Sequence, residues 1–304
     1  NLQSTFAALS FYNPDTTPWI IGAVEAVLVG YCLLGGGKRV IKATSTLVPL
    51  MGVIYISVAF ILTIMHINLV PGVVGRIFAE AFDFTAIFGG FAGSCMMFGI
   101  KRGLYSNEAG VGSAPNAAAA ADVSHPVKQG LVQMLSVFID TLLICTATAF
   151  MCLSSGIEPT KELAGAPYVQ AALAASMGDY AKLFITVSMV LFAFTTLLGN
   201  LYYVDNAFAY VLKHVPGKTF TLCYRILACV LIFIGAGSSM GTMWDLADVT
   251  MGFMAIINLP VICILGGPAL RALDDYTEQR NAGKNPEFKA SKIGLTKKLD
   301  YWQD

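Results

Sequence analysis

Residues 101–115 carry the groups that best suit the binding of a small polar ligand in an otherwise apolar surrounding. The segment reads KRGLYSNEAGVGSAP and follows an apolar run at 84–100. Ser106 and Asn107 supply a hydroxyl and an amide that can hydrogen-bond to a ligand. Gly110 has no side chain, so a small ligand can approach the backbone closely there. The segment is therefore the first candidate for a binding site.

The apolar run before this segment is long enough to belong to a transmembrane helix, so the polar residues interrupt that helix. In lipid, irregular backbone must be buried in protein or line a wet cavity, because unpaired N–H and C=O groups are costly there. One half-helix end offers N–H groups to an anion, and the other offers carbonyl oxygens to a cation. This pair of ends predicts a site for a small zwitterion with a companion cation. The alternative is that 101–116 is a cytoplasmic loop between two helices.

Hydroxyl and carboxylate groups in other apolar stretches are further candidates for ion binding. Thr195 and Thr196 place two hydroxyl oxygens in FAFTTLLGNLYY, and a hard cation such as sodium prefers oxygen ligands. The alternative for a threonine is a hydrogen bond to the carbonyl four residues earlier in its own helix. Asp140, in VFIDTLLICT, is the deepest acidic residue, and an unpaired charge is costly there. It either helps to bind a cation or holds a partner helix.

Motifs for catalysis, phosphate binding and metal binding are absent from the sequence. The GGGKR motif at 35–39 lacks the leading glycine spacing and the Ser or Thr of a phosphate loop. No HExxH motif occurs, and the cysteines lie in or beside apolar stretches without a CxxC pair. We interpret them as small core residues rather than disulfides or metal ligands. The sequence therefore predicts a protein that is not an enzyme and has no cofactor or resident metal.

The composition places these candidate sites in a membrane protein. Of the 304 residues, 56% are hydrophobic and 12% are charged, whereas a soluble domain carries about 25% charged residues. Basic and acidic residues are equal in number at 19 each, which leaves no basic surface for nucleic acid. Seven stretches meet or approach the length of a transmembrane helix: 19–36, 44–66, 84–105, 129–153, 181–204, 220–240 and 244–267. We therefore expect an all-α polytopic membrane protein with a single transmembrane domain at 1–270.

The positions of lysine and arginine predict the orientation of the chain. Cytoplasmic loops are enriched in these residues, and most of them follow the first, third, fifth and seventh apolar stretches. The C-terminal tail, 271–304, is therefore expected in the cytoplasm. Its polar composition of mixed charge predicts a surface segment without a fixed fold. The first residue is not methionine, so we expect the chain to be the later part of a longer protein.

The segment 99–150 closely resembles one family of transporters. It contains KRGLYSNEAGVGSAPNAAAAA and HPVKQGLVQMLSVFIDT, which resemble the alanine or glycine:cation symporters, also called sodium:alanine symporters. We assign the resemblance to the C-terminal two-thirds of the chain, with weaker similarity elsewhere. It implies a LeuT-type inverted-repeat transporter fold, in which the seven apolar stretches correspond to the fourth to tenth core helices. The first three core helices would then be missing.

The resemblance also implies roles for individual residues. It places the substrate contacts on the unwound segment and at the chain start, on Leu104, Ser106, Asn107, Gly110 and Gln3. Leu104 would face the side chain of the bound amino acid, and Gln3 is similar to an amide residue before the fourth core helix. Thr195 and Thr196 match the position at which the eighth core helix supplies hydroxyl groups to a sodium ion.

The function implied by the resemblance is sodium-coupled symport of alanine or glycine across the plasma membrane by alternating access. The expected partners are the amino acid, sodium and the lipid bilayer, with no obligate protein partner and no nucleic acid. Three alternatives stay open. A proton on Asp140 or Glu108 would replace sodium as the coupling ion, a membrane-embedded enzyme would use Asp140 with a second buried acid, or the chain would be a non-transporting fragment.

Overall fold

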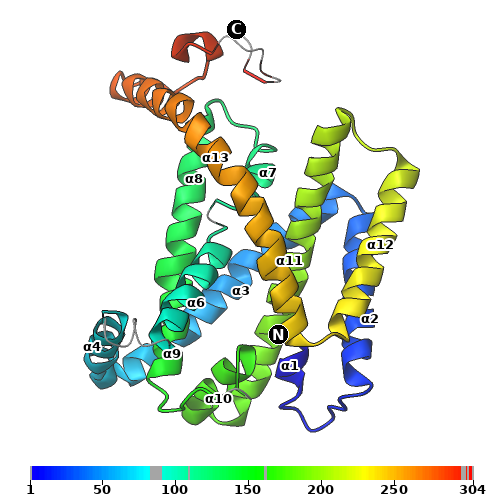
Figure 1. Ribbon diagram of the computed structural model, residues 1–304, viewed down its shortest axis with the longest axis vertical. Helices are drawn as coiled ribbons and strands as arrows, with labels where there is room; N and C mark the ends of the chain where they lie inside the picture. Colours follow the sequence, from blue (N-terminus) through cyan, green and yellow to red (C-terminus); the bar gives the residue numbers. More distant parts are fainter. Residues whose placement is uncertain are drawn as a thin grey trace. The chain divides into compact units, whose positions relative to one another are not determined.

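Every regular element among the described residues of the computed structural model is a helix (Figure 1). The structure describes residues 2–82, 91–108, 110–160, 163–295, 299 and 301–302. The predicted all-α class is therefore confirmed for these residues. In chain order the elements are α1 (Leu2–Phe6), α2 (Thr17–Leu34), α3 (Gly37–Met65), η1 (Ile67–Leu69), α4 (Val70–Ala81), α6 (Phe91–Ser106), α7 (Ala114–Ala118), α8 (Pro126–Phe138), the π-helical η2 (Ile139–Cys145), α9 (Thr146–Leu153), α10 (Ala166–Met177), α11 (Asp179–Leu212), α12 (Lys218–Ala236), α13 (Met240–Asn281) and η3 (Ala290–Ile293).

Six helical stretches in the described part of the chain are long and apolar enough to cross a membrane. They are Thr17–Leu34, Gly37–Met65, Pro126–Leu153, Asp179–Leu212, Lys218–Ala236 and Met240–Asn281. A seventh predicted span, 84–105, falls partly on residues 83–90, which lie outside the described residues, and α6 is its described part. The described residues therefore account for six of the seven predicted spans.

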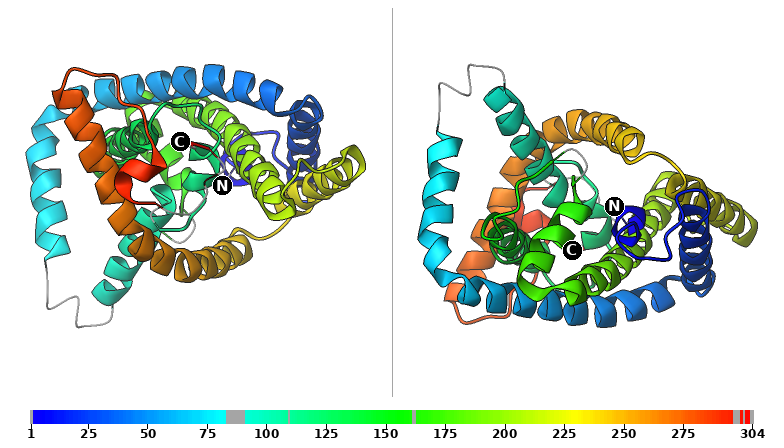
Figure 2. Two further views of the ribbon diagram at one scale, coloured as in Figure 1. Left: turned by 90° about the horizontal axis from the view of Figure 1, so that it is seen from above. Right: turned by 90° about the horizontal axis from the view of Figure 1, so that it is seen from below.

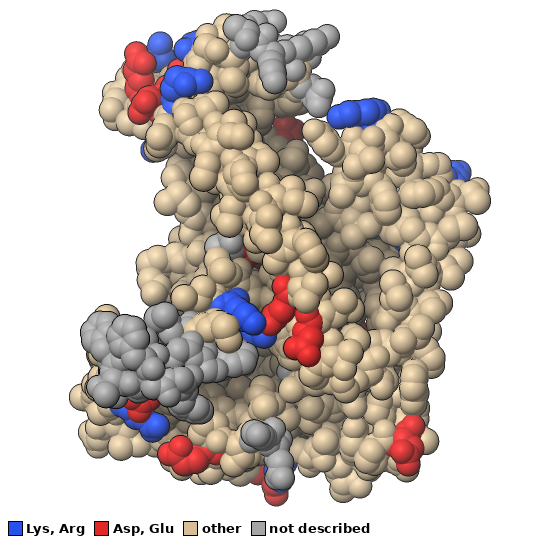
Figure 3. Space-filling view, in the orientation of Figure 1, with Lys and Arg blue, Asp and Glu red and all other residues tan. Residues whose placement is uncertain are grey.

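The outer surface of these helices is apolar. Uncharged residues cover most of the face drawn in Figure 3. Large side chains such as Ile257, which is 72% exposed, lie on the outside of the long helices. Exposed apolar surface of this extent on helices of membrane-spanning length is typical of a polytopic membrane protein.

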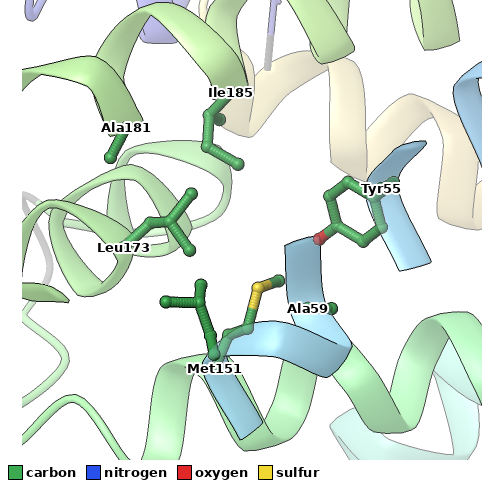
Figure 4. Close-up of a cluster of buried hydrophobic side chains, with 7 residues drawn as sticks. Tyr55, Ala59, Met151, Leu173, Ala181 and Ile185 are labelled. Atoms are coloured by element: carbon green, nitrogen blue, oxygen red, sulfur yellow. The ribbon is translucent and has the colours of Figure 1, made fainter. Parts of the chain in front are cut away.

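The chain divides into two compact units, which we describe separately. The first comprises 1–98 and 141–246, and the second comprises 99–140 and 247–304. The main core of the first unit lies between α3, α9, α10 and α11, where it consists of Tyr55, Ala59, Leu62, Met151, Leu173, Ala181 and Ile185 (Figure 4). The Tyr55 hydroxyl also hydrogen-bonds to Oγ1 of Thr148 at 2.9 Å. This core holds α11 against α3 and so positions the predicted threonine pair.

Helix α2 packs along α12 in the same unit (Figures 1 and 2). Gly22 permits their close approach, because a Cβ atom there would lie 2.6 Å from the Cβ of Ala236. Near the end of α2, Arg225 of α12 donates to the carbonyl of Leu33 at 2.6 Å and forms an ion pair with Asp205 at 2.9 Å. Apolar packing and a charge-assisted hydrogen bond therefore fix α2 on its neighbours.

The C-terminal tail packs within the second unit. Helix α13 continues to Asn281, and beyond it Phe288 and Ile293 are buried together with Ala272. The backbone N–H of Phe288 donates to the carbonyl of Ser124 at 2.9 Å. The prediction that the tail has no fixed fold is therefore wrong for its described part. Its few apolar side chains gather into a small core that a count of polar residues does not reveal.

His125 precedes α8 and is fully buried in the second unit. Its Nδ1 accepts the backbone N–H of Val127 at 3.2 Å and so caps α8, while Nε2 lies 3.4 Å from Oδ2 of Asp275. Because Nδ1 is an acceptor here, the ring proton sits on Nε2 and points to Asp275. Burial lowers the pKa of His125 in spite of this carboxylate. The imidazole is therefore neutral at neutral pH.

Candidate functional site

The described residues between α6 and α7 form no regular helix, which both the predicted interruption and the loop alternative require. Helix α6 ends at Ser106 and α7 begins at Ala114, with no regular helix between them in the described residues. The backbone takes positive φ angles of 49° at Glu108, 77° at Gly110 and 91° at Gly112. Glycine adopts such angles at little cost, which explains two of the three positions. Helix α6 therefore ends where the polar residues of GLYSNEAGVGS begin.

Side chains of the segment between α6 and α7 form hydrogen bonds within the segment and to the end of α6. Asn107 is half-buried, and its Nδ2 donates to the carbonyl of Gly103 at 3.0 Å. Ser113 donates its hydroxyl to Oε2 of Glu108 at 2.6 Å. Leu104, one turn earlier, is 46% exposed. These hydrogen bonds therefore lie within the segment and the end of α6, and the Leu104 side chain stays partly exposed.

Two of the predicted site residues meet directly in the second unit. The Ser106 hydroxyl donates to Oδ2 of Asp140 at 2.6 Å, although the two residues are 34 positions apart in sequence. Asp140 lies in η2, and π-helical stretches are rare and occur frequently at functional sites. A carboxylate and a hydroxyl at the end of a broken helix offer oxygen atoms to a cation or to an ammonium group.

Helix α13 places a residue against the interrupted segment that the sequence did not predict there. Asn258 donates its amide N–H to the carbonyl of Gly110 at 3.0 Å. A Cβ atom at Gly112 would lie 2.9 Å from Cγ of Asn258. The neighbouring carbonyl of Gly112 accepts the amide of Asn116 at 3.2 Å. A lone asparagine in the apolar run MAIINLPVICIL was the available signal, because an amide in lipid needs a partner.

An ion pair also joins α6 to α13 in the second unit. Nη2 of Arg102 lies 3.3 Å from Oδ2 of Asp248, and Nζ of Lys101 lies 3.6 Å from the same oxygen. The charged residues at the start of the polar segment are therefore partnered across the two helices. Their partner, Asp248, is a charged residue in an apolar stretch, which is where intramembrane pairs are expected.

The two predicted sodium ligands differ in their surroundings in the first unit. Thr195 is buried, and its hydroxyl donates to the carbonyl of Leu191 at 2.9 Å, four residues earlier in α11. Its Oγ1 also lies 3.9 Å from Sδ of Met51 on α3. Thr196 is exposed, because consecutive helical residues point about 100° apart. The oxygen of Thr195 keeps acceptor capacity, so its role as a sodium ligand stays a prediction.

Gln3, the remaining predicted contact, lies on α1 of the first unit. It is half-buried, and its Nε2 donates to the hydroxyl of Tyr12 at 3.4 Å. Close by in sequence, the carbonyl of Thr5 accepts the amide of Gln170 at 3.2 Å, and Gln170 also donates to Oγ1 of Thr186 at 3.1 Å. This buried polar network ties α1 to α10 and α11 and was not predicted from the sequence.

The predicted site residues thus fall into two sets. Gln3, Thr195 and Thr196 belong to the first unit, whereas Leu104, Ser106, Asn107, Gly110 and Asp140 belong to the second. Among the described residues, no group of three or more His, Cys, Asp or Glu side chains is arranged to hold a metal ion. Within the second set, Ser106 and Asp140 are joined directly by a hydrogen bond.

Comparison with known proteins identifies the family. The model of the sodium:alanine symporter family matches residues 2–290. The match extends over nearly the whole chain, so the assignment of the resemblance to the C-terminal two-thirds is wrong. The restriction came from the unusual composition of 99–150, which carries the most specific motifs but only part of the similarity.

Three relatives place the chain more closely. The amino-acid carrier protein AlsT of Bacillus subtilis is 42% identical over 285 residues, which cover 94% of this chain and 60% of that protein. The probable sodium/glutamine symporter GlnT of the same species is 41% identical over 289 residues, 95% of this chain and 60% of that protein. A sodium/proton-dependent alanine carrier protein of Bacillus sp. strain PS3 is 37% identical over 318 residues, 100% of this chain and 71% of that protein.

The chain spans about 60% of the length of the first two of these relatives. With its apolar helices, it is a multi-pass membrane protein. The family match over residues 2–290 and the identities with the three carriers show that the chain belongs to the sodium:alanine symporter family.

Proposed function

We propose that this chain forms part of a transporter that carries alanine or glycine across the plasma membrane together with sodium by alternating access, and that it is not an enzyme. The observation that carries the proposal is the broken helix between α6 and α7, with Ser106 bonded to Asp140 at its end. A discontinuous helix inside a membrane domain suits a small zwitterion, because its two ends offer charge of opposite sign. The names of the relatives, which include an alanine carrier and an amino-acid carrier, support the same substrate class.

The proposed substrate contacts are Ser106, Asn107 and the backbone at Gly110, with Leu104 beside the substrate side chain. Gln3 is a further proposed contact. Thr195 and Thr196 supply hydroxyl oxygens to sodium in this proposal, in line with the oxygen preference of a hard cation. The amino acid and sodium then stabilise the same conformer, so each raises the affinity for the other by the same factor. A membrane potential adds about 2.3 kcal/mol per charge per 100 mV to the driving force.

The fold and orientation proposed for the intact protein follow from the family and from the charge distribution. We assign the chain a LeuT-type inverted-repeat architecture, with the C-terminal tail in the cytoplasm. The tail carries seven of the 19 lysine and arginine residues, which favour the cytoplasmic side. The protein needs no soluble cofactor in this mechanism, and sodium enters as a transported ion.

Proton coupling is the second candidate function, and one contact favours it. Asp140 accepts a short hydrogen bond from Ser106 at 2.6 Å, in a position that connects a carboxyl group to the broken helix. One relative is named a sodium/proton-dependent alanine carrier. In this version a proton on Asp140 accompanies the amino acid, and uptake continues without sodium.

Uptake of radiolabelled alanine into proteoliposomes containing the full-length protein tests both versions. An inward sodium gradient is compared with potassium in its place, for the wild type, for Asn107→Ala and for Asn281→Ala as the matched control. Asn281 is exposed at the end of α13, outside the site. We expect uptake to collapse without sodium and in Asn107→Ala but to persist in the control. Uptake that ignores sodium would favour the proton version, and no uptake of alanine or glycine would refute the proposed function.

A further inference from the structure

Asn258 of α13 donates a side-chain hydrogen bond to the interrupted segment. Its Nδ2 lies 3.0 Å from the carbonyl oxygen of Gly110, 148 positions away in sequence. The residue is half-buried within an apolar stretch, where water is scarce. An amide in such a place finds its partner in protein. Here that partner is a carbonyl that the break in the helix has released.

The peptide unit between Gly110 and Val111 is held at both of its ends. Its carbonyl oxygen accepts the amide of Asn258, and its N–H, which belongs to Val111, donates to the carbonyl of Glu108 at 3.2 Å. Val111 itself is buried. A peptide plane with both polar groups bonded cannot rotate without breaking a hydrogen bond. Asn258 therefore sets which way the carbonyl of Gly110 points.

The side chains of α13 also occupy the space that side chains at the glycines would need. A Cβ atom at Gly112 would lie 2.9 Å from Cγ of Asn258, and one at Gly110 would lie 2.6 Å from Cδ2 of Leu259. Both glycines have positive φ angles, of 91° and 77° respectively. The irregular segment and α13 are thus fitted to each other at two successive residues of the helix.

We propose that Asn258 is a positioning residue that acts through the backbone of Gly110 and fixes the shape of the unwound segment for substrate binding. It does not itself touch the substrate. The carbonyl oxygen of Gly110 is held by Asn258, and the N–H of Val111 is held by Glu108. The backbone of the segment is thereby kept in one conformation for the ligand. The role in substrate binding rests on the proposed function, whereas the role in shaping the segment does not.

Alanine uptake by the full-length protein in proteoliposomes tests the first part. Asn258→Leu and the isosteric Asn258→Asp both remove the amide donor, whereas Asn258→Gln retains it. We expect the half-saturating alanine concentration to rise about tenfold in the first two, the factor that one hydrogen bond supplies, with the maximal rate little changed. Asn258→Gln should restore most of the affinity. Ile257→Ala, at an exposed neighbouring position of α13, is the control and should behave as the wild type.

Hydrogen–deuterium exchange of peptides covering 104–116 provides a readout that does not depend on transport. Exchange in this segment should be faster in Asn258→Leu and Asn258→Asp than in the wild type and in Ile257→Ala. Unchanged exchange and an unchanged half-saturating concentration would overturn the inference. If Asn258→Leu does not reach the membrane, exchange and the half-saturating alanine concentration are compared between Asn258→Asp and Asn258→Gln. Equal values in these two variants would likewise overturn the inference. Faster exchange in a protein that transports no alanine would retain the positioning role and refute only the proposed function.

Discussion

At the scale of single residues, the chemistry of this protein depends on polar groups that find partners inside apolar surroundings. Ser106 donates to Asp140, and Asn258 donates to Gly110. Glu25 of α2 is different, since it is only 5% exposed and its Oε2 has no hydrogen-bond partner among the described residues. A buried polar group without a partner costs free energy, which the rest of the fold has to offset.

Replacing Ser106 with Ala should weaken sodium-driven alanine uptake. The substitution removes the donor to Asp140, so we expect the half-saturating alanine concentration to rise about tenfold, from the loss of one hydrogen bond to a charged group. Ser136→Ala is the matched control, because the Ser136 hydroxyl donates to the carbonyl of Gln133 in its own helix. Equal affinities in the two variants would show that the Ser106–Asp140 contact has no part in binding.

Replacing Glu25 with Leu should stabilise the protein. The change removes a buried oxygen without a partner and fills the same space with apolar atoms, for an expected gain of about 1–3 kcal/mol. Thermal unfolding in detergent, followed by tryptophan fluorescence, measures the effect. Glu278→Leu, at an exposed position of α13, should change stability by less than about 0.5 kcal/mol. A lower unfolding temperature in Glu25→Leu would show that the carboxyl group has a stabilising role.

At the scale of elements, helices are joined through their ends as well as along their sides. Arg225 of α12 donates to a carbonyl near the end of α2, and His125 accepts a backbone N–H at the start of α8. Free N–H and C=O groups at helix ends need such partners. The cap on α8 lies beside the tail, where Lys128 donates to Asn285 at 2.7 Å and the ring of His125 contacts the ring of Phe288. Protonation of Nδ1 of His125 would remove the acceptor of this cap and should therefore weaken the start of α8.

The stability of the protein should fall with pH below about 6.5, the ordinary value for histidine. Burial lowers the pKa of His125 in the folded state. Below about pH 6.5 the unfolded state therefore binds more protons, and this binding stabilises it relative to the native state. His125→Asn keeps an acceptor at the N-cap but cannot titrate, and its stability should depend less on pH. Unfolding temperatures measured from about pH 8 to about pH 5 for both proteins test the difference. If the unfolding temperature changes equally with pH in the wild type and in His125→Asn, groups other than His125 cause the pH dependence.

At the scale of the whole molecule, the protein is a multi-pass membrane protein of the sodium:alanine symporter family. Its apolar exterior suits lipid, and most of its lysine and arginine residues lie beside the ends of the apolar stretches. The asymmetry of lysine and arginine is a property of the entire chain rather than of any helix. It leads to a prediction about orientation.

The C-terminal end of α13 should face the cytoplasm, and the start of α11 should face outward. In a cysteine-free background of the full-length protein, Asn281→Cys should react with a membrane-impermeant maleimide only in inside-out vesicles. Tyr180→Cys, at a position that is 82% exposed, should react only in right-side-out vesicles. The opposite labelling pattern would reverse the proposed orientation, and labelling of both residues from one side would contradict the predicted topology.

The amino-acid sequence by itself determined the class of the protein and the place of the helix break. Apolar length and low charge are sums over a segment, so they predict membrane helices without any knowledge of contacts. GLYSNEAGVGS predicts an interruption because glycines and polar residues disfavour helix locally. Only the tertiary structure decided which groups meet. Ser106 with Asp140, Asn258 with Gly110 and the packed C-terminal tail all join residues far apart in sequence. Such pairings depend on how the helices pack against one another, so they cannot be predicted from the pattern of residues within one segment.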